Sequence, residues 1–171
     1  MQTICNKPLL GKIPVFKEQI DYLVYQSILN NLLSLNKDKI FLITSCWANE
    51  GKSTTIYYLA NLLAANNKVA LINTDYKIHK KTLETLLINK SNNLDYYCGE
   101  INILDSLINN YDYLFVDCAP TLEYTNPINT INKVSSVIFL ITNKEFPCYQ
   151  LNRGSADFND KVVGVILNKA S

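Results

Sequence analysis

Five apolar runs, each ending in a polar residue, constrain the fold of this 171-residue chain more than any other feature of its sequence. Each run is apolar along nearly its whole length, which is typical of a strand buried on both faces. The runs are residues 39–45, 69–73, 113–117, 136–142 and 162–168, ending at Ser45, Asn73, Asp117, Thr142 and Asn168. Because helical segments separate them, we predict an α/β fold with a mostly parallel sheet flanked by helices on both faces. Ligands of such sheets bind at the carboxyl ends of the strands, where these polar residues would gather.

The segments between the runs are expected to be mainly helical. From residue 15 to residue 35, apolar side chains recur at intervals of three and four, which indicates an amphipathic helix. Further helices are expected at residues 51–66, 78–88 and 101–108, and a short strand at residues 94–98. Residues 1–14 contain Pro8, Gly11 and Pro14, and we predict that they form an irregular lead-in.

Composition favours one packed domain without a nucleic-acid partner. Hydrophobic residues make up 48% of the chain and charged residues 18%, which is typical of a globular protein. The net charge is only +1, whereas proteins that bind nucleic acid concentrate Lys and Arg on one face, so we expect no nucleic acid. No run approaches the roughly 18 apolar residues of a membrane span, and the N-terminus does not resemble a secretion signal. We therefore expect a cytoplasmic protein.

The cysteines give no sign of a metal site. There are five of them, and they form neither a C-x-x-C pair nor a Cys/His ligand pattern. We interpret all five as reduced thiols, at Cys5, Cys46, Cys98, Cys118 and Cys148.

The segment from Ser45 to Thr54, Ser-Cys-Trp-Ala-Asn-Glu-Gly-Lys-Ser-Thr, joins a predicted buried strand to a predicted helix. In that position the N–H groups of the loop and of the helix start, together with the helix dipole, form a cradle for phosphate groups. Lys52 can reach the terminal phosphates, and the Ser53 hydroxyl can bind Mg²⁺. Gly51 lets the backbone approach where a side chain would collide.

The pattern G-x-x-x-x-G-K-[ST] of a phosphate loop (P-loop) is incomplete here, because Cys46 occupies the first glycine position. A left-handed backbone costs most residues ~1–2 kcal/mol, but Asn49 tolerates it better than others. The alternative to a P-loop is a purely structural turn, and the strand and helix on either side favour nucleotide binding. The predicted nucleotide-binding residues are Asn49, Glu50, Gly51, Lys52, Ser53 and Thr54. Residues 15–171 are then expected to form a single P-loop nucleotide-binding domain.

Two aspartates support such a site. Asp117 ends an apolar strand, where a carboxylate would hold Mg²⁺ at the sheet edge. Asp75 follows another strand by two residues and could face the same cavity. Either aspartate alone could be a turn or helix-cap residue. Together, after a P-loop, they favour a metal-binding role for Asp117 and a catalytic role for Asp75.

Four segments resemble, in order, motifs of the bacterial tyrosine kinases. Residues 43–55, ITSCWANEGKSTT, resemble T-S-x-x-P-G-E-G-K-S-T. Residues 71–77, LINTDYK, resemble a strand ending in D-x-D-x-R. Residues 111–120, YDYLFVDCAP, resemble Y-D-x-h-h-h-D-x-P-P, where h is hydrophobic, and residues 163–169, VGVILNK, resemble G-V-V-L-N-K. The match covers residues 13–169, nearly the whole chain.

The resemblance implies a protein of capsular and exopolysaccharide biosynthesis that binds ATP or ADP with Mg²⁺. Such kinases are cytoplasmic, work with a membrane-anchored adaptor that regulates polysaccharide chain length, and phosphorylate tyrosines in their own C-terminal tail. Lys52 would steady the phosphates, while Ser53 and Asp117 would hold Mg²⁺. Asp75 would be the surviving, catalytic member of an acidic pair. Asn168 would lie near the adenine.

The departures from the family pattern affect the expected chemistry. Asn73 stands where the family has the first aspartate of D-x-D, and general-base help is typically worth ~10²–10⁴ in rate. Lys77 replaces an arginine and loses its planar fork of donors. Ala48 and Asn49 replace the Pro-Gly of the loop, and Ala119 replaces a proline. We therefore expect phosphoryl transfer to be weakened or lost.

Other departures concern assembly and substrate. The stretch between the two aspartates is shorter than in the family. Residues 18–24 align with the E-x-x-R-x-x-R oligomerisation helix, but Asp21 and Val24 stand at the arginine positions, so the oligomeric state is left open. The tyrosine cluster expected after the last strand is absent, so we do not expect self-phosphorylation at the usual site. We interpret the adjacent pairs Tyr57–Tyr58 and Tyr96–Tyr97 as packing residues.

Three functions are compatible with these features. The first, which we favour, is a nucleotide-dependent scaffold in polysaccharide assembly with weakened or lost kinase activity. The second is an active tyrosine kinase with an external protein substrate. The third is a relative of division-site and partition ATPases, whose signature lysine position is occupied here by Trp47, which we expect to pack against a neighbouring loop.

Overall fold

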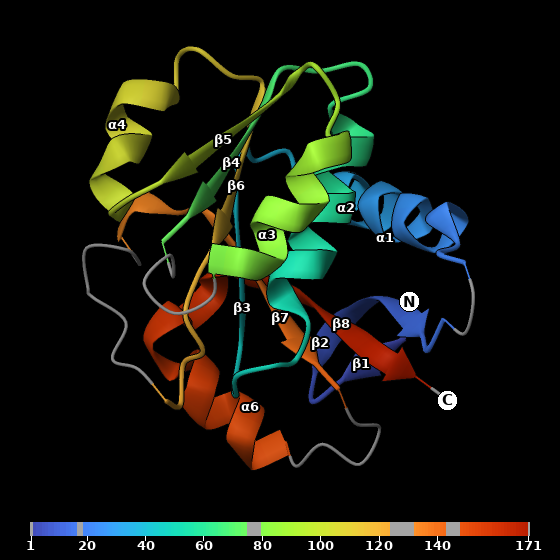
Figure 1. Cartoon of the computed structure of the whole chain (residues 1–171). Coiled ribbons are helices and arrows are strands. Elements are labelled where there is room, and N and C mark those ends of the chain that lie inside the picture. Colours follow the sequence, from blue (N-terminus) through green and yellow to red (C-terminus); the bar gives the residue numbers. More distant parts are fainter. Residues whose placement is uncertain (1, 17–18, 75–79, 124–131, 143–147, 171) are drawn as a thin grey trace.

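One sheet of eight strands organises the molecule, with the order β1-β2-β8-β7-β3-β6-β4-β5 (Figure 1). The computed structural model describes residues 2–16, 19–74, 80–123, 132–142 and 148–170. Every neighbouring pair of strands is parallel except β1 and β2. The strands are β1 (Thr3–Ile4), β2 (Lys7–Pro14), β3 (Ile40–Ser45), β4 (Val69–Asn73), β5 (Leu94–Cys98), β6 (Tyr113–Asp117), β7 (Ser136–Ile141) and β8 (Val162–Ala170). The predicted α/β fold with a mostly parallel sheet is confirmed.

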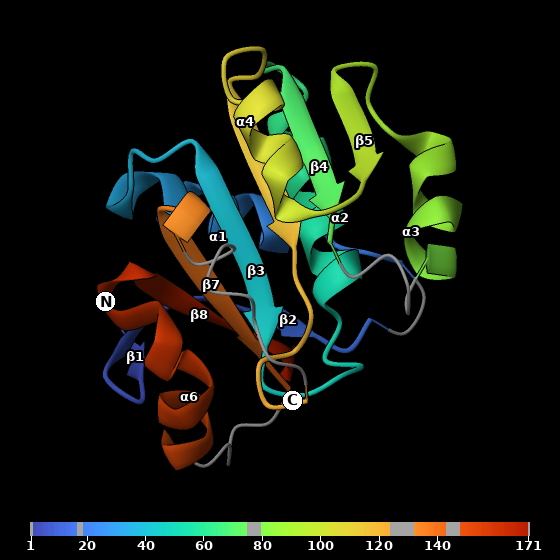
Figure 2. The same ribbon diagram turned by 90° about the vertical axis from the view of Figure 1, so that its left-hand side faces the viewer.

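Helices cover both faces of this sheet (Figure 2). They are α1 (Tyr22–Leu35), α2 (Lys52–Leu63), α3 (Lys80–Leu86), α4 (Leu104–Leu107) and α6 (Cys148–Ser155), with 3₁₀ segments η1 (Leu87–Asn89), η2 (Ile101–Ile103) and η3 (Ala156–Lys161). Alternate residues of a strand point to opposite faces. In β3, Phe41 and Ile43 therefore pack with α1 and α2, while Ile40 and Leu42 pack with α4 and α6. No helix in the described part of the chain is long and apolar enough to cross a membrane.

Helix α1 begins later than the apolar periodicity predicted. Its first residue is Tyr22, and the Asp21 carboxylate caps it by accepting the N–H of Leu23 at 2.9 Å. Aspartate is a favoured residue at this position because it satisfies a backbone donor that has no partner within the helix. The Asp21 side chain thus serves the helix start.

The prediction of an irregular lead-in at residues 1–14 was wrong. Residues Lys7–Pro14 form β2, which lies beside β8 in parallel, with Leu10 and Ile13 buried in the core. Proline is tolerated at strand ends, and Pro14 is the last residue of β2. A Cβ at Gly11 would lie 2.4 Å from Cγ1 of Ile28, so this glycine allows α1 to pack closely on the strand. The position of Pro14 at the strand end and the packing of Gly11 against Ile28 thus allow a strand to form here.

The interpretation of all five cysteines as reduced thiols was also wrong. Cys5 and Cys148 form a disulfide bond with their Cα atoms 5.2 Å apart, and Cys46, Cys98 and Cys118 are free. The partners are separated by 143 residues in the sequence. Only the three-dimensional fold brings the β1–β2 turn next to the start of α6, so no sequence spacing indicated the bond.

The adjacent tyrosines of α2 pack as expected. Tyr57 and Tyr58 are 4% and 7% exposed, and their rings contact each other edge to face at a centroid distance of 5.2 Å. Tyr58 also contacts Tyr25 of α1 at 4.9 Å. These rings join α1 to α2, so they serve the core.

Candidate nucleotide-binding site

The predicted P-loop lies between the end of β3 and the start of α2, and two of its residues have a left-handed backbone. Asn49 has a φ of 62°, and Gly51, which directly precedes α2, has a φ of 91°. The structure thus confirms the conformation for which asparagine is suited at position 49. A Cβ at Gly51 would lie only 2.4 Å from Nδ2 of Asn168, so a side chain there would meet both backbone strain and a collision.

Side chains from two other strands hold this loop in shape. Nδ2 of Asn168, in β8, donates to the carbonyl oxygen of Glu50 at 2.8 Å. The Glu50 carboxylate accepts the N–H of Trp47 at 3.1 Å and the hydroxyl of Thr142, directly after β7, at 3.3 Å. Glu50 is 5% exposed, and this burial raises the pKa of its carboxyl, although the hydrogen bond from Trp47 acts in the opposite direction. The Glu50 side chain is thus directed at the protein's own groups.

The hydroxyl of Ser53 and the carboxylate of Asp117 meet beside the loop. Ser53, in the first turn of α2, donates to Oδ2 of Asp117 at 2.6 Å. Thr74 donates both its N–H and its hydroxyl to the Asp117 carbonyl, at 3.0 and 2.8 Å, which ties the ends of β4 and β6 together. Asp117 is 1% exposed at the end of β6.

This pair of oxygen ligands suits Mg²⁺. Magnesium in nucleotide sites takes one or two protein oxygens and leaves its other positions to phosphates and water. The described residues contain no group of three or more His, Cys, Asp and Glu that could hold a metal by themselves. A hydroxyl next to one carboxylate at a helix start is therefore the expected protein share of such a site.

Lys52 is the first residue of α2 and is 5% exposed. The nearby Glu50 carboxylate attracts the Lys52 ammonium group, and an anion at the helix start would add a second negative partner while also meeting the helix dipole. Together, Lys52, Ser53 and the N–H groups of the first turn provide what a phosphate group requires.

A cavity of about 380 Å³ adjoins the other side of the loop. Its walls include Asn49, Gly51 and Thr54 of the loop and helix start, Asn168 of β8, and the apolar residue Phe16. The predicted binding residues Asn49, Gly51, Thr54 and Asn168 are thus brought together around one space. Its position beside the loop and its mixed polar and apolar lining suit a nucleoside.

Asn73 lies at the other end of the site, where β4 ends. It is 1% exposed, and its Nδ2 donates to the hydroxyl of Tyr96, in β5, at 3.2 Å. Burial raises the pKa of the Tyr96 hydroxyl. Asp75, predicted to be catalytic, lies outside the described residues. The sequence motifs gave no indication of Tyr96.

Two further side chains contact the loop without belonging to any motif. Oε1 of Glu123 accepts the N–H of Ala48 at 2.6 Å, a donor that a proline at this position would lack. Oε1 of Gln150, in α6, accepts the indole N–H of Trp47 at 3.2 Å. Trp47 packs against α6 while remaining 42% exposed. A motif search could not find Glu123 or Gln150, because neither is adjacent to the loop in sequence.

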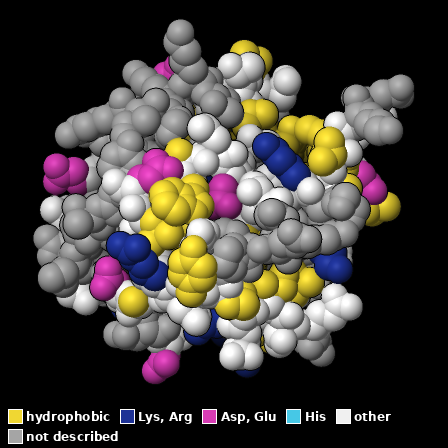
Figure 3. Space-filling model, turned by 90° about the horizontal axis from the view of Figure 1, so that it is seen from below, with side chains coloured by type: hydrophobic (Ala, Val, Ile, Leu, Met, Phe, Trp, Pro, Cys, Tyr) yellow, Lys and Arg dark blue, Asp and Glu magenta, His cyan; other side chains and the backbone are white. Residues whose placement is uncertain are grey.

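The surface at this end of the molecule is mixed in character. Hydrophobic side chains gather near its centre, with acidic and basic side chains around them (Figure 3). Trp47 and Tyr149 are among the large hydrophobic residues that are exposed, at 42% and 67%. Isolated hydrophobic residues on a protein surface are normal. Trp47 belongs to the P-loop, and Tyr149 lies in α6 next to Gln150, the residue that contacts Trp47.

Comparison with known proteins places the fold among P-loop proteins. No protein-family model matches the chain, and no curated protein matches it. Among solved structures, the chimerical protein CapA2B2 is similar with a TM-score of 0.75 and 21% identity, covering 97% of this chain and 96% of that one. The kinase domain of the Escherichia coli tyrosine kinase ETK has a TM-score of 0.73 and 16% identity, covering 96% and 92%. A plasmid partition protein from Borrelia burgdorferi has a TM-score of 0.53 and 22% identity, covering 77% and 78%.

The fold and the loop together define an α/β P-loop protein. Within that class, this chain shares its fold with the tyrosine kinase domains of ETK and BceF over nearly its whole length. The resemblance found in four sequence motifs thus agrees with the structure.

Proposed function

We propose that this chain binds ATP or ADP together with Mg²⁺ at the loop of residues 45–54. The observation that carries the proposal is the 2.6 Å contact between Ser53 and Asp117 beside a loop with the required left-handed residues. Mg²⁺ bound by these two oxygens would neutralise phosphate charge. Lys52 and the N–H groups at the start of α2 orient the phosphates by charge and by donated hydrogen bonds.

The nucleoside part of the ligand occupies the cavity beside the loop. Phe16 provides an apolar wall for a base, and Asn168 offers an amide close to the same space. Because Asn168 also holds the Glu50 carbonyl, one residue links the base pocket to the phosphate loop.

The function that best fits these residues is a nucleotide-dependent scaffold in capsular or exopolysaccharide assembly, with weakened or lost kinase activity. Asn73 supports this choice, because an amide has no basicity with which to accept a proton from a tyrosine hydroxyl. Its Nδ2 is already donated to Tyr96. The chain would thus keep nucleotide binding while its capacity for phosphoryl transfer is weakened or lost.

An active tyrosine kinase acting on an external substrate is the alternative. The presence of Lys52, Ser53 and Asp117 supports it, since these residues position and neutralise the transferred phosphate. A partition-type ATPase has less support, because those structures are less similar and Trp47 stands at the position of their signature lysine.

As partner we propose a membrane-anchored adaptor that regulates polysaccharide chain length, which would place the chain in the cytoplasm at the inner face of the membrane. The fold shared with the tyrosine kinase domains supports this proposal. Nucleic acid is not a proposed partner, because the net charge of the chain is only +1.

Titration calorimetry with Mg-ADP and Mg-ATP, beside a radiolabelled phosphate-transfer assay, tests the proposal. We expect the wild type to bind nucleotide and Lys52→Met to bind roughly ten- to a hundredfold more weakly, as for loss of a charged hydrogen bond. Little or no transfer is expected from either protein. Transfer that disappears in Lys52→Met would establish the active kinase instead, and absence of binding at millimolar nucleotide would overturn the proposal.

A further inference from the structure

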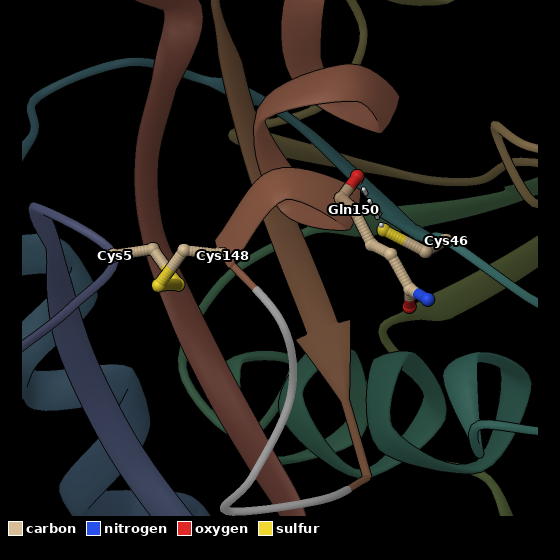
Figure 4. The surroundings of a disulfide bond; sticks show 4 residues. All are labelled: Cys5, Cys46, Cys148 and Gln150. Carbon is tan, nitrogen blue, oxygen red and sulfur yellow. Dashed lines mark hydrogen bonds between the residues drawn. A yellow bond between two sulfur atoms is a disulfide. The ribbon is translucent and has the colours of Figure 1, made fainter.

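The Cys5–Cys148 disulfide ties the N-terminal turn to the first residue of α6 (Figure 4). Cys5 and Asn6 are the two residues of the β1–β2 turn, and both have a left-handed backbone, with φ of 51° and 63°. This geometry is that of a tight hairpin turn, which fixes the position of its side chains. The bond therefore anchors the start of α6 to a rigid point of the sheet.

Two residues beyond Cys148, the same helix turn holds the P-loop. The carbonyl oxygen of Gln150 accepts the thiol of Cys46 at 3.5 Å (Figure 4). Oε1 of Gln150 accepts the indole N–H of Trp47 at 3.2 Å. Cys46 and Trp47 are the first two residues of the loop after β3. One helix turn thus connects the disulfide to the phosphate-binding segment.

The two ends of α6 are held in different ways. Leu151, the fourth residue of the helix, is fully buried, and a Cβ at Gly154 would lie 2.5 Å from Oγ1 of Thr121, so the helix packs tightly from Leu151 onward. Cys148 and Tyr149 in the first turn are exposed. The positions of residues 148–150, which precede the buried Leu151, therefore depend on the disulfide and on the contacts of Gln150.

The cysteines around the site also differ in reactivity. Cys148 is exposed, so a dithiol reductant can reach the bond. Cys46 is buried, and burial followed by the nearby Glu50 raises the pKa of its thiol to about 12. It therefore remains a protonated thiol that does not attack the disulfide.

We propose that Cys5–Cys148 is a reversible thiol–disulfide site that controls how firmly the P-loop is held, and through it the affinity for nucleotide. The proposal rests on the proposed nucleotide binding and on a cytoplasmic location, where disulfides are mostly transient and redox-sensing. A dithiol supplies two electrons and two protons, the S–S bond breaks into two thiols, and the dithiol becomes a disulfide. Residues 148–150 are then released from the hairpin turn, Gln150 leaves Cys46 and Trp47, and nucleotide binding must order the loop anew.

Three measurements on the full chain test the proposal, beginning with a thiol count under denaturing conditions. Protein purified without reductant should show three free thiols, and protein treated with dithiothreitol and then freed of it should show five. Five thiols in protein that was mildly oxidised and never reduced would overturn the proposal, because the bond would not form.

Calorimetry with Mg-ADP then compares the oxidised and reduced forms. We expect reduction, or Cys148→Ser, to weaken binding roughly three- to tenfold through loss of preorganisation. Gln150→Ala removes the side-chain contact with Trp47 but keeps the backbone contact with Cys46, so it should show part of this loss when oxidised and a smaller further loss on reduction. Cys98→Ser, which removes an exposed thiol outside the disulfide, should keep the full response. Equal affinity of the oxidised and reduced wild type would overturn the proposal.

Fluorescence of Trp47, the only tryptophan in the chain, separates this inference from the proposed function. The indole N–H loses its partner when Gln150 moves, so reduction should shift the emission without any nucleotide present. A shift without nucleotide binding in either form would overturn the proposed function and support the coupling between bond and loop. Unchanged emission in a protein whose thiol count rises from three to five would overturn the coupling.

Discussion

The carboxyl edge of the sheet has two halves that differ in how their polar groups are used. On the side of β3, β7 and β8, Asn168 and Thr142 hold the P-loop through Glu50, and Ser53 meets Asp117. On the side of β4 and β5, the corresponding position is Asn73, whose amide donates to Tyr96. The first half has the groups needed to bind a phosphate, whereas the second has an amide where related motifs have a carboxylate.

Phosphate binding and phosphoryl transfer place separate demands on the same sheet. Phosphate binding needs a backbone of fixed shape, a cation and oxygen ligands, all supplied by residues close to one loop. Transfer also needs a proton acceptor on the neighbouring strand. One substitution in β4 can therefore affect chemistry while the loop remains intact.

Gly51→Ala is expected to have the largest effect on the binding half. A left-handed backbone costs a non-glycine residue ~1–2 kcal/mol, and the new Cβ would lie 2.4 Å from Nδ2 of Asn168. We expect affinity for Mg-ADP to fall on the order of a hundredfold, or about 2.7 kcal/mol, by calorimetry. Gly99→Ala is the control, since a Cβ there has nothing within 4 Å. Normal binding by Gly51→Ala would show that the loop tolerates another shape.

Asn73→Asp tests the half of the edge formed by β4 and β5. Its effect, on the free energy of unfolding, is expected to be the second largest. Asn73 is paired with Asp117 across β4 and β6, so the variant places two carboxylates side by side in a buried position. We expect the free energy of unfolding at pH 7 to fall by about 2 kcal/mol in urea titrations without metal.

Asn102→Asp makes the same chemical change on the surface and should leave stability nearly unchanged. If Asn73→Asp were as stable as the wild type, this end of the sheet would still accommodate a second carboxylate. The contrast between the two halves would then be weaker than the side-chain contacts indicate.

Much of the fold and of the binding half could be predicted from the sequence, because the responsible residues are local. A run such as residues 39–45 is apolar on both faces, and Gly51, Lys52 and Ser53 follow it directly. The helix start and the phosphate cradle therefore arise from one continuous segment.

The features that could not be predicted depend on contacts between distant parts of the chain. Strand β2 contains prolines and a glycine, and it is a strand because β8 and α1 pack beside it. Cys5 meets Cys148, and Gln150 meets the loop, only after the sheet has formed. Tertiary contacts outweighed local breaker residues and composition in each case.

Asp117→Asn tests the boundary between the two halves and should have a smaller effect than Gly51→Ala. The amide keeps the size of the carboxylate and can still accept the Ser53 hydroxyl, but it is a poorer ligand for Mg²⁺. We expect the affinity for Mg-ADP to fall about tenfold, or 1.4 kcal/mol, with little change for ADP in the presence of a chelator. Asp105→Asn, at an exposed residue, should bind as the wild type does. A loss that is equal with and without metal would indicate a role in shaping the loop instead.

Glu50→Gln should have the smallest effect, which depends on pH. Burial raises the pKa of the Glu50 carboxyl in the folded state above its pKa in the unfolded state. The contribution of Glu50 to stability is therefore complete below the unfolded-state pKa and is lost as the pH rises through the folded-state pKa. Glutamine cannot ionise and still accepts the N–H of Trp47 through its carbonyl oxygen. The variant should therefore gain stability relative to the wild type as pH rises from 4 to 8 in urea titrations. Glu100→Gln, at an exposed residue, provides the control for loss of charge alone. If the stability difference between Glu50→Gln and the wild type did not grow with pH, the hydrogen bonds from Trp47 and Thr142 would outweigh the effect of burial on the Glu50 pKa. The loop would then be held by an ionised Glu50 carboxylate.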